Sequence, residues 1–333
     1  MNISIVICAF NSENRIQAAL NGVSSQKFGE PVMWETIVVD NGSTDGTLHQ
    51  VRAFADQNPH LRISCIREGC PGLQAARHAG IRAARGDLII FVDDDNELDP
   101  SYMATALRLM DRWPSAGVIG GCGILASDSE VPDWFPLVAK SYALGSQPTR
   151  DGRRNYVYGA GMVLRRSAWE KILSLGYKSL LTDRVGASLS CGGDVEICAA
   201  MRIAGFEVYA SDELVFRHHI GAGRMRLSYY ARLLNGSGDA GAILSMWHAA
   251  AAKHEWTLIR VWGSIALNVL GALPYTIIAC VHMRLIGLPR GGHWHSQARQ
   301  KRKVLVATFF GSQFAAASAI IRYTKRARRN SRL

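Results

Sequence analysis

Residues 87–97 read DLIIFVDDDNE, an apolar run that ends in three consecutive carboxylates, Asp93, Asp94 and Asp95. The apolar run predicts a buried β-strand. Three carboxylates at its end repel one another and are costly to remove from water. A divalent cation would remove this cost, and oxygen ligands favour a hard ion such as Mg²⁺ or Mn²⁺, which also binds substrate phosphates. The stretch indicates a metal-dependent enzyme with a phosphate-bearing substrate. The alternative is an acidic loop or a helix cap after a strand.

Strand and helix patterns alternate through the first half of the chain. Residues 3–9 and 35–40 are continuous apolar runs typical of buried parallel strands, and helical periodicity follows each of them. This alternation predicts an α/β fold with a mostly parallel central sheet. In such sheets the ligand binds beyond the carboxyl ends of the strands, where Asn11, Asp40 and the three aspartates all fall. The sequence thus predicts that separate polar positions converge on one site.

The chain of 333 residues is basic, with a formal net charge of +11. The excess lies late, in residues 299–303 and 322–332, which indicates an anionic partner, either nucleic acid or acidic lipid. A hydrophobic content of 48% excludes a disordered chain. The seven cysteines include no CxxC pair, so we expect a reducing compartment rather than a zinc site or a disulfide framework.

The last third of the chain contains two uncharged apolar stretches, residues 261–281 and 304–321. Each is long enough to be a membrane helix candidate, and a pair of buried helices is the alternative. Two true spans would place the basic loop between them across the membrane from the catalytic part, against the positive-inside tendency. Helices that stay in one leaflet would let both basic segments meet anionic lipid. We therefore expect a catalytic domain at 1–235 and a membrane-associated helical region at 236–333, on the cytoplasmic face of the cell membrane.

Five stretches of the chain occur together in a characteristic order. They are residues 4–13 (SIVICAFNSE), 35–47 (ETIVVDNGSTDGT), 72–80 (GLQAARHAG), the aspartate cluster and 192–196 (GGDVE). In these stretches the chain resembles the family 2 glycosyltransferases, which have the GT-A fold, and the resemblance covers roughly residues 2–234. It implies an inverting, metal-dependent glycosyltransferase that takes a sugar from a nucleotide-sugar donor, with a UDP-sugar expected. The expected acceptor is a lipid-linked or cell-surface glycan.

The resemblance also implies roles for single residues. Asp40 would accept a hydrogen bond from the base, or it is only a turn cap. Arg77 would meet the base or the phosphates, or it is a solvated helix arginine. Asp95 would bind the Mn²⁺ or Mg²⁺ ion that bridges the diphosphate. The residues that the resemblance assigns to the nucleotide sugar are Ala9, Phe10, Asn11, Glu13, Asp40, Arg77, Asp93 and Asp94.

Asp194 is the expected general base, because it follows two glycines and precedes a predicted helix whose dipole favours a carboxylate. The alternative is a plain helix cap. Family members commonly have Glu-Asp here, whereas this chain has Gly193-Asp194, which leaves the acceptor contacts open; Glu196 is a possible substitute. A family histidine at the metal corresponds to His218, or to His219 in another register. Further expected contacts are Arg224 or Arg226 on the diphosphate, and Trp134, Phe135 and Tyr142 on the acceptor or in the core.

Three rival functions are weighed against this interpretation. A nucleotidyltransferase would normally show a glycine-rich basic loop after the first strand, and Asn11-Ser12-Glu13 lacks one. A nucleic-acid-binding protein would have aromatic residues among the basic ones, but the tail contains only Tyr323. A catalytically inactive membrane scaffold that binds nucleotide would not need the intact acidic positions. We therefore expect a nucleotide sugar, a glycan acceptor and an anionic membrane surface as partners, and no nucleic acid.

Overall fold

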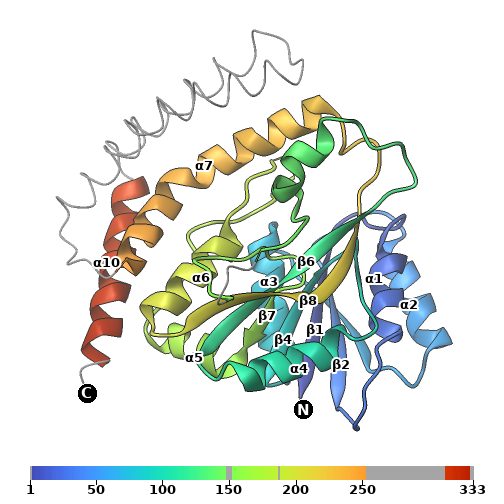
Figure 1. The fold of residues 1–333 in the computed structure, drawn as a ribbon, viewed down its shortest axis with the longest axis horizontal. Helices are drawn as coiled ribbons and strands as arrows, with labels where there is room; N and C mark the ends of the chain where they lie inside the picture. Colours follow the sequence, from blue (N-terminus) through green and yellow to red (C-terminus); the bar gives the residue numbers. More distant parts are fainter. Residues whose placement is uncertain (1, 148–151, 187, 253–311, 331–333) are drawn as a thin grey trace.

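The computed structural model describes residues 2–147, 152–186, 188–252 and 312–330. One sheet of eight strands lies between layers of helices (Figure 1). The strands follow the order β3-β2-β1-β4-β7-β6-β8-β5 across the sheet. Their bounds are Ile3–Ala9 (β1), Trp34–Asp40 (β2), Ile63–Arg67 (β3), Leu88–Asp93 (β4), Asn96–Leu98 (β5), Ala116–Ala126 (β6), Val163–Arg165 (β7) and Glu207–His219 (β8).

The sheet is parallel in its first half and mixed beyond β4. Strand β1 pairs in parallel with β2 and β4, and β2 pairs in parallel with β3. The short β7 runs antiparallel to both β4 and β6, and β5 runs antiparallel to β8, whereas β6 and β8 are parallel. The predicted α/β fold is confirmed. The expectation of a mostly parallel sheet holds only for the half that contains the βα repeats, because β7 enters the sheet after the irregular middle segment and from the opposite direction.

Helices cover both faces of the sheet, because successive side chains of a buried strand point to opposite faces. In β1, Ile5 and Ile7 pack in the core under α1, α2 and α4, while Val6 and Cys8 pack in the core under α3, α5 and α6. Gly80 of α3 lies directly on Val6, where a Cβ would clash. The helices are Ile16–Ser24 (α1), Thr47–Gln57 (α2), Leu73–Ala83 (α3), Tyr102–Arg112 (α4), Arg166–Ser174 (α5), Gly193–Ile203 (α6), Leu227–Ala251 (α7) and Ser312–Asn330 (α10), with a 3₁₀ helix, η1, at Phe135–Tyr142.

The C-terminal helix α10 packs on the catalytic part of the chain, beside α6 and the end of α7 (Figure 1). Its buried face includes Ile320 and Tyr323, and the Tyr323 hydroxyl donates to the Ala200 carbonyl oxygen of α6 at 2.8 Å. The rings of Tyr177 and Trp247 lie 6.3 and 5.6 Å from that of Tyr323. The expected boundary between residues 235 and 236 therefore falls inside α7, and residues 312–330 belong to the core of the fold.

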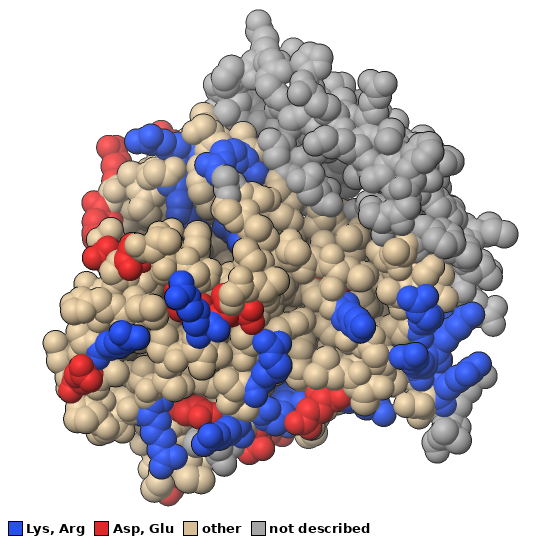
Figure 2. Space-filling model, turned by 180° about the vertical axis from the view of Figure 1, so that it is seen from behind, with Lys and Arg blue, Asp and Glu red and all other residues tan. Residues whose placement is uncertain are grey.

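The predicted membrane helices are described only in part. Residues 261–281 and 304–311 lie outside the described residues, and residues 312–321 form the first half of α10. Among the described helices, none has the length and apolar character needed to cross a bilayer. Lys and Arg side chains gather at the edge of the rear face where α10 lies (Figure 2). The exposed basic residues of α10 are Arg322, Lys325, Arg326 and Arg329.

Candidate active site

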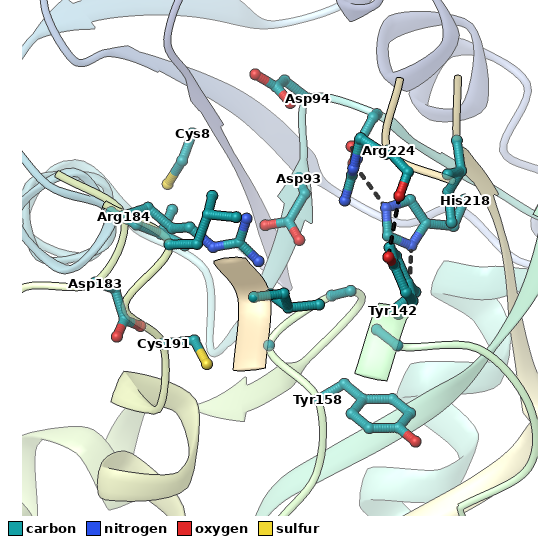
Figure 3. Close-up of a pocket in the computed structure, with 18 of the residues that line it drawn as sticks. Cys8, Asp93, Asp94, Tyr142, Tyr158, Asp183, Arg184, Cys191, His218 and Arg224 are labelled. Carbon is teal, nitrogen blue, oxygen red and sulfur yellow. Dashed lines mark hydrogen bonds and ion pairs between the residues drawn. The ribbon is translucent and has the colours of Figure 1, made fainter. Parts of the chain in front are cut away.

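A cleft of about 1330 Å³ opens beyond the carboxyl ends of β1, β2 and β4, where the sequence predicts a ligand site. The loop after β1 and the start of α3 form one wall, and the end of β8 with the segment before α7 forms another. Residues before and within α6 lie between these walls. Polar positions from distant parts of the sequence therefore meet in one place (Figure 3).

The three aspartates after β4 make different contacts, and Figure 3 shows Asp93 and Asp94 pointing apart. Asp93 lies 3.8 Å from the Arg77 guanidinium. Asp94 accepts hydrogen bonds from Arg15 at 3.0 Å and from the Ser12 hydroxyl, so it anchors the chain that leads into α1. Burial, with the neighbouring Asp95 charge, raises the pKa of Asp94 above its ordinary value. All three aspartates line the cleft, and the predicted contact of Asp94 with the nucleotide sugar stays a prediction.

Asp95 and His218 converge across the cleft. The Asp95 Oδ1 atom lies 3.4 Å from His218 Nε2, and the second Asp95 oxygen accepts from Arg224. His218 Nδ1 lies 2.8 Å from the Tyr142 carbonyl oxygen, to which it can only donate, so Nε2 is the ring nitrogen that faces Asp95. Burial opposes ionisation of Asp95, but His218 and Arg224 outweigh it and hold the pKa of the carboxyl below its ordinary value.

These two side chains fit a divalent cation. An anionic oxygen and an imidazole nitrogen 3.4 Å apart can occupy neighbouring positions around one ion. The Arg224 guanidinium already places a positive charge on Asp95. No group of three or more His, Cys, Asp or Glu side chains suited to a metal occurs among the described residues, so further ligands would come from substrate and water. The side chain of the neighbouring His219 instead meets the Glu97 carboxylate at 2.8 Å.

The residues predicted to contact the nucleotide after β1 fall into two groups: some line the cleft, and others hold the turn after β2 in place. Ala9 and Phe10 line the cleft, and the Phe10 ring is 46% exposed. Asn11 accepts from the Thr44 backbone N–H at 2.9 Å, and Glu13 accepts from Gly46 at 3.1 Å. Asn11 and Glu13 therefore hold the turn after β2, and neither lines the cleft as expected from the sequence.

Asp40 lies fully buried at the end of β2. Its Oδ1 atom accepts from the Ser43 backbone N–H at 2.9 Å, which bears out the turn-cap alternative for one oxygen. Its Oδ2 atom has no hydrogen-bond partner among the described residues, and the nearest cation, Arg67, is 3.8 Å away. A buried carboxylate oxygen without a donor is costly, but Asp40 does not itself line the cleft, so its contact with a nucleotide base stays a prediction.

Arg77 is buried beneath the cleft, with only 4% of its surface exposed. It lies 3.8 Å from Asp93 and 3.7 Å from Asp183, and its guanidinium stacks over the Phe91 ring. The solvated-arginine alternative is therefore wrong. Burial raises the pKa of Asp183 to about 6, and Arg77 opposes this rise. Asp183 drew no attention in the sequence, because nothing in its neighbourhood marks it as buried.

Asp194 stands in the first turn of α6 and lines the cleft. Its Oδ2 atom accepts from the Gly159 backbone N–H at 2.8 Å, and Oδ1 from Val195 at 2.8 Å. The N-cap residue of α6 is Gly192, and the bond from Val195 gives Asp194 part of a capping role as well. Glu196 cannot substitute for the missing family carboxylate, because it is fully buried and does not line the cleft.

The aromatic residues of the irregular segment pack together. Phe135 and Tyr142 are buried, their rings 4.7 Å apart, and Trp134 lies against Phe135 and Tyr230. Core packing, one of the two alternatives, therefore describes Trp134 and Phe135, while Tyr142 also borders the cleft. The side of the cleft near Asp194 is instead lined by Tyr156, Tyr158, Leu244 and His248, which the sequence analysis missed.

Comparison with known proteins agrees with this arrangement. Residues 4–173 match the family described as glycosyl transferase family 2, about half of the chain, and the chain belongs to this family. The dodecaprenyl-phosphate galacturonate synthase of Rhizobium johnstonii is 34% identical over 113 residues, which cover 34% of this chain and 33% of the relative. The chain thus matches about a third of that relative's length.

Solved structures share the fold at low identity. TarS 1–349 of S. aureus, solved in complex with UDP-GlcNAc, superposes with a TM-score of 0.58 at 15% identity, over 100% of this chain and 92% of TarS 1–349. The mannosyltransferase PcManGT of Pyrobaculum calidifontis, solved with GDP-Man and Mn²⁺, superposes with a TM-score of 0.55 at 17% identity, over 98% of this chain and 86% of PcManGT. The GT-A-like α/β fold expected from the sequence is confirmed.

Proposed function

We propose that the protein is an inverting, metal-dependent glycosyltransferase that moves a sugar from a nucleotide-sugar donor to a glycan hydroxyl. One observation carries the proposal: the Asp95–His218 pair and the Asp194 carboxylate line the same cleft. The pair suits the diphosphate of a donor through a cation, and Asp194 suits the hydroxyl of an acceptor. Membership of glycosyl transferase family 2 supports this assignment.

The donor side of the cleft suits a nucleoside diphosphate sugar, and we take a UDP-sugar as the first candidate. The unpartnered Asp40 oxygen would accept from the base, Phe10 offers a face for stacking, and Asp93 would accept from ribose hydroxyls. One fold neighbour was solved with a UDP-sugar and another with a GDP-sugar. This supports a nucleotide sugar as donor but does not select the base.

Asp95 and His218 would hold Mn²⁺ or Mg²⁺, which as a Lewis acid stabilises negative charge on a departing diphosphate. Arg224 lies on Asp95 and adds a second cation on this side of the cleft. The Tyr142 carbonyl oxygen holds His218 in the ring orientation that directs Nε2 toward Asp95. A fold neighbour solved with Mn²⁺ supports metal use.

Asp194 would remove the proton of the acceptor hydroxyl as its oxygen attacks the anomeric carbon. The bond from that carbon to the diphosphate breaks in the same displacement, so the configuration of the sugar inverts. Backbone N–H groups of Gly159 and Val195 hold the Asp194 carboxylate in place, and each of its oxygens keeps a free lone pair for the incoming proton.

A panel of nucleotide sugars tests the function. We expect the full chain to release nucleoside diphosphate from one of UDP-glucose, UDP-galactose, UDP-GlcNAc or GDP-mannose when Mn²⁺ is present. Binding of UDP without turnover of any donor would favour the inactive scaffold. Release of inorganic diphosphate from a nucleoside triphosphate and a sugar phosphate would favour the nucleotidyltransferase.

We also propose that the enzyme works on the cytoplasmic face of the cell membrane, on a lipid-linked or cell-surface glycan. The uncharged residues 261–281 and the basic residues 299–303 and 322–332 support this location. The full chain should then sediment with membranes. Single cysteines placed in the two basic segments should both resist an impermeant thiol reagent on intact cells. Labelling of the first segment alone would instead indicate two true spans.

A further inference from the structure

A second cavity, of about 330 Å³, lies where α6 ends and β8 begins. Arginines dominate its wall, with a single carboxylate among them. Its lining residues are Arg153, Arg154, Asn155, Tyr156, Arg202 and Glu207. Three guanidinium groups on so small a cavity give it a net positive charge, which favours an anionic ligand.

The backbone fixes these arginines in place. The Arg154 N–H donates to the Val208 carbonyl oxygen of β8 at 2.8 Å, and Arg153 pairs with Tyr209 as an isolated antiparallel bridge. Arg202 stands in the last turn of α6. The buried Nε atom of Arg154 has no hydrogen-bond partner among the described residues, and no described acidic group lies within ion-pair distance of Arg154 or Arg202. An unpartnered buried N–H is costly, and an anionic oxygen would satisfy it.

The cavity adjoins the acceptor side of the main cleft. Tyr156 lines both cavities. Its ring packs edge to face against the ring of His248, a residue of the main cleft, with the ring centroids 6.0 Å apart. Burial lowers the pKa of His248, and nearby Arg202 lowers it further. Along α6, the eight residue steps from Asp194 to Arg202 give a rise of about 12 Å along the helix axis. The expected catalytic base and the second cavity therefore lie at opposite ends of α6.

We propose that this cavity is an anion subsite for the acceptor, which rests on the proposed glycosyltransferase function. The acceptor would place a hydroxyl at Asp194, in the first turn of α6, and a phosphate or carboxylate at Arg154 and Arg202, near the other end of that helix. Guanidinium groups bind both anions through paired hydrogen bonds. The anion belongs either to the diphosphate of a lipid carrier or to an acidic sugar of the glycan, and both present the same chemistry to the site.

Binding of defined probes tests the subsite. The full chain would be saturated with UDP and Mn²⁺, so that the donor side is filled, and then titrated with trigalacturonic acid, farnesyl diphosphate and the neutral maltotriose. We expect at least one anionic probe to bind about tenfold more tightly than maltotriose at low salt. The variant Arg154→Gln/Arg202→Gln should lose this preference, and Arg202→Gln alone should lose part of it.

The matched control is Arg52→Gln/Arg112→Gln, which removes the same charge from exposed positions on α2 and α4. This control should keep the preference. Equal binding of maltotriose and both anions, or an equal loss in the control, would overturn the subsite. Preference for farnesyl diphosphate would assign the anion to a lipid carrier, and preference for trigalacturonic acid would assign it to the glycan. Either preference supports the anion subsite. Failure of UDP to bind the wild-type chain would instead contradict the proposed function.

Discussion

Asp194 and Asp183 are two carboxylates of the same cleft with different surroundings. Among the described residues, Asp194 accepts hydrogen bonds from two backbone N–H groups, whereas Asp183 accepts from the Gly193 N–H and also lies 3.7 Å from the Arg77 guanidinium. We predict that Asp194→Asn lowers kcat by about a hundredfold or more, the scale of a lost general base. Affinity for the nucleotide should stay within a few-fold, because the change lies on the acceptor side.

Asp183→Asn is the matched control for that variant, because it neutralises a neighbouring carboxyl of the same cleft that is held by Arg77 and the Gly193 N–H. Its effect on kcat should be much smaller, and steady-state kinetics with both substrates varied would separate the two. Loss of nucleotide binding together with activity in Asp194→Asn would show instead that Asp194 belongs to the donor side.

His218 and His219 offer a test within one dipeptide. Only His218 is directed at Asp95, while His219 meets Glu97. We predict that Mn²⁺ strengthens UDP binding to the wild-type chain and to His219→Gln, measured by calorimetry. In His218→Gln the gain in UDP affinity on adding Mn²⁺ should be smaller by about tenfold or more, because a metal ligand is lost. The opposite ranking of the two variants, or binding independent of EDTA, would contradict the metal site.

Much of the donor side follows from the sequence, because local rules decide it. The aspartates after β4 and the position of Asp40 at a strand end come from apolar runs and the edge rule of parallel sheets. Spacing favoured His218 over His219, but the sequence left the register open, because it depends on the pairing with β5 and on the Tyr142 carbonyl oxygen. The deviation of Asp94 toward Arg15 likewise depends on tertiary packing.

At the scale of elements, Glu196 joins α6 to α7 and to the segment before Asp183. Its carboxylate accepts from Trp247 Nε1 at 2.9 Å, from the Ser179 hydroxyl at 2.9 Å, and from the N–H groups of Leu180 and Leu181. Burial nevertheless raises its pKa to about 7, with these hydrogen bonds opposing the rise. The acidic side chain is therefore a helix connector whose charge titrates near neutral pH.

We predict that Glu196→Gln changes how stability depends on pH. The pKa of Glu196 is higher in the folded chain than in the unfolded chain, so its protonated form stabilises the fold. This contribution to the unfolding free energy is fully present below about pH 4 and is lost as the pH rises through about 7. Relative to wild type, Glu196→Gln should therefore gain on the order of 2 kcal/mol in unfolding free energy between pH 5 and pH 8. Denaturant unfolding at several pH values measures this, and the exposed Glu170→Gln should show no such trend.

At the scale of the whole molecule, the C-terminal helix α10 belongs to the same core as the α/β sheet. The sequence indicated a separate membrane region from residue 236, because long uncharged stretches and basic runs carry no sign of where they pack. The structure places α10 on α6 and α7, with Ile320 and Tyr323 buried. The basic residues of α10 lie on its other side, so one helix serves both the core and a charged surface.

The stability of the catalytic fold should therefore depend on α10. We predict that Tyr323→Ala lowers the unfolding free energy by about 3 kcal/mol, because it removes a buried ring between Tyr177 and Trp247. Tyr323→Phe should cost only about 1 kcal/mol, for the hydrogen bond to Ala200. The exposed neighbour Lys325→Ala should stay near wild type. A chain shortened to residue 252 should be less stable still; if it unfolded at the same denaturant concentration as the full chain, α10 would be only an appendage.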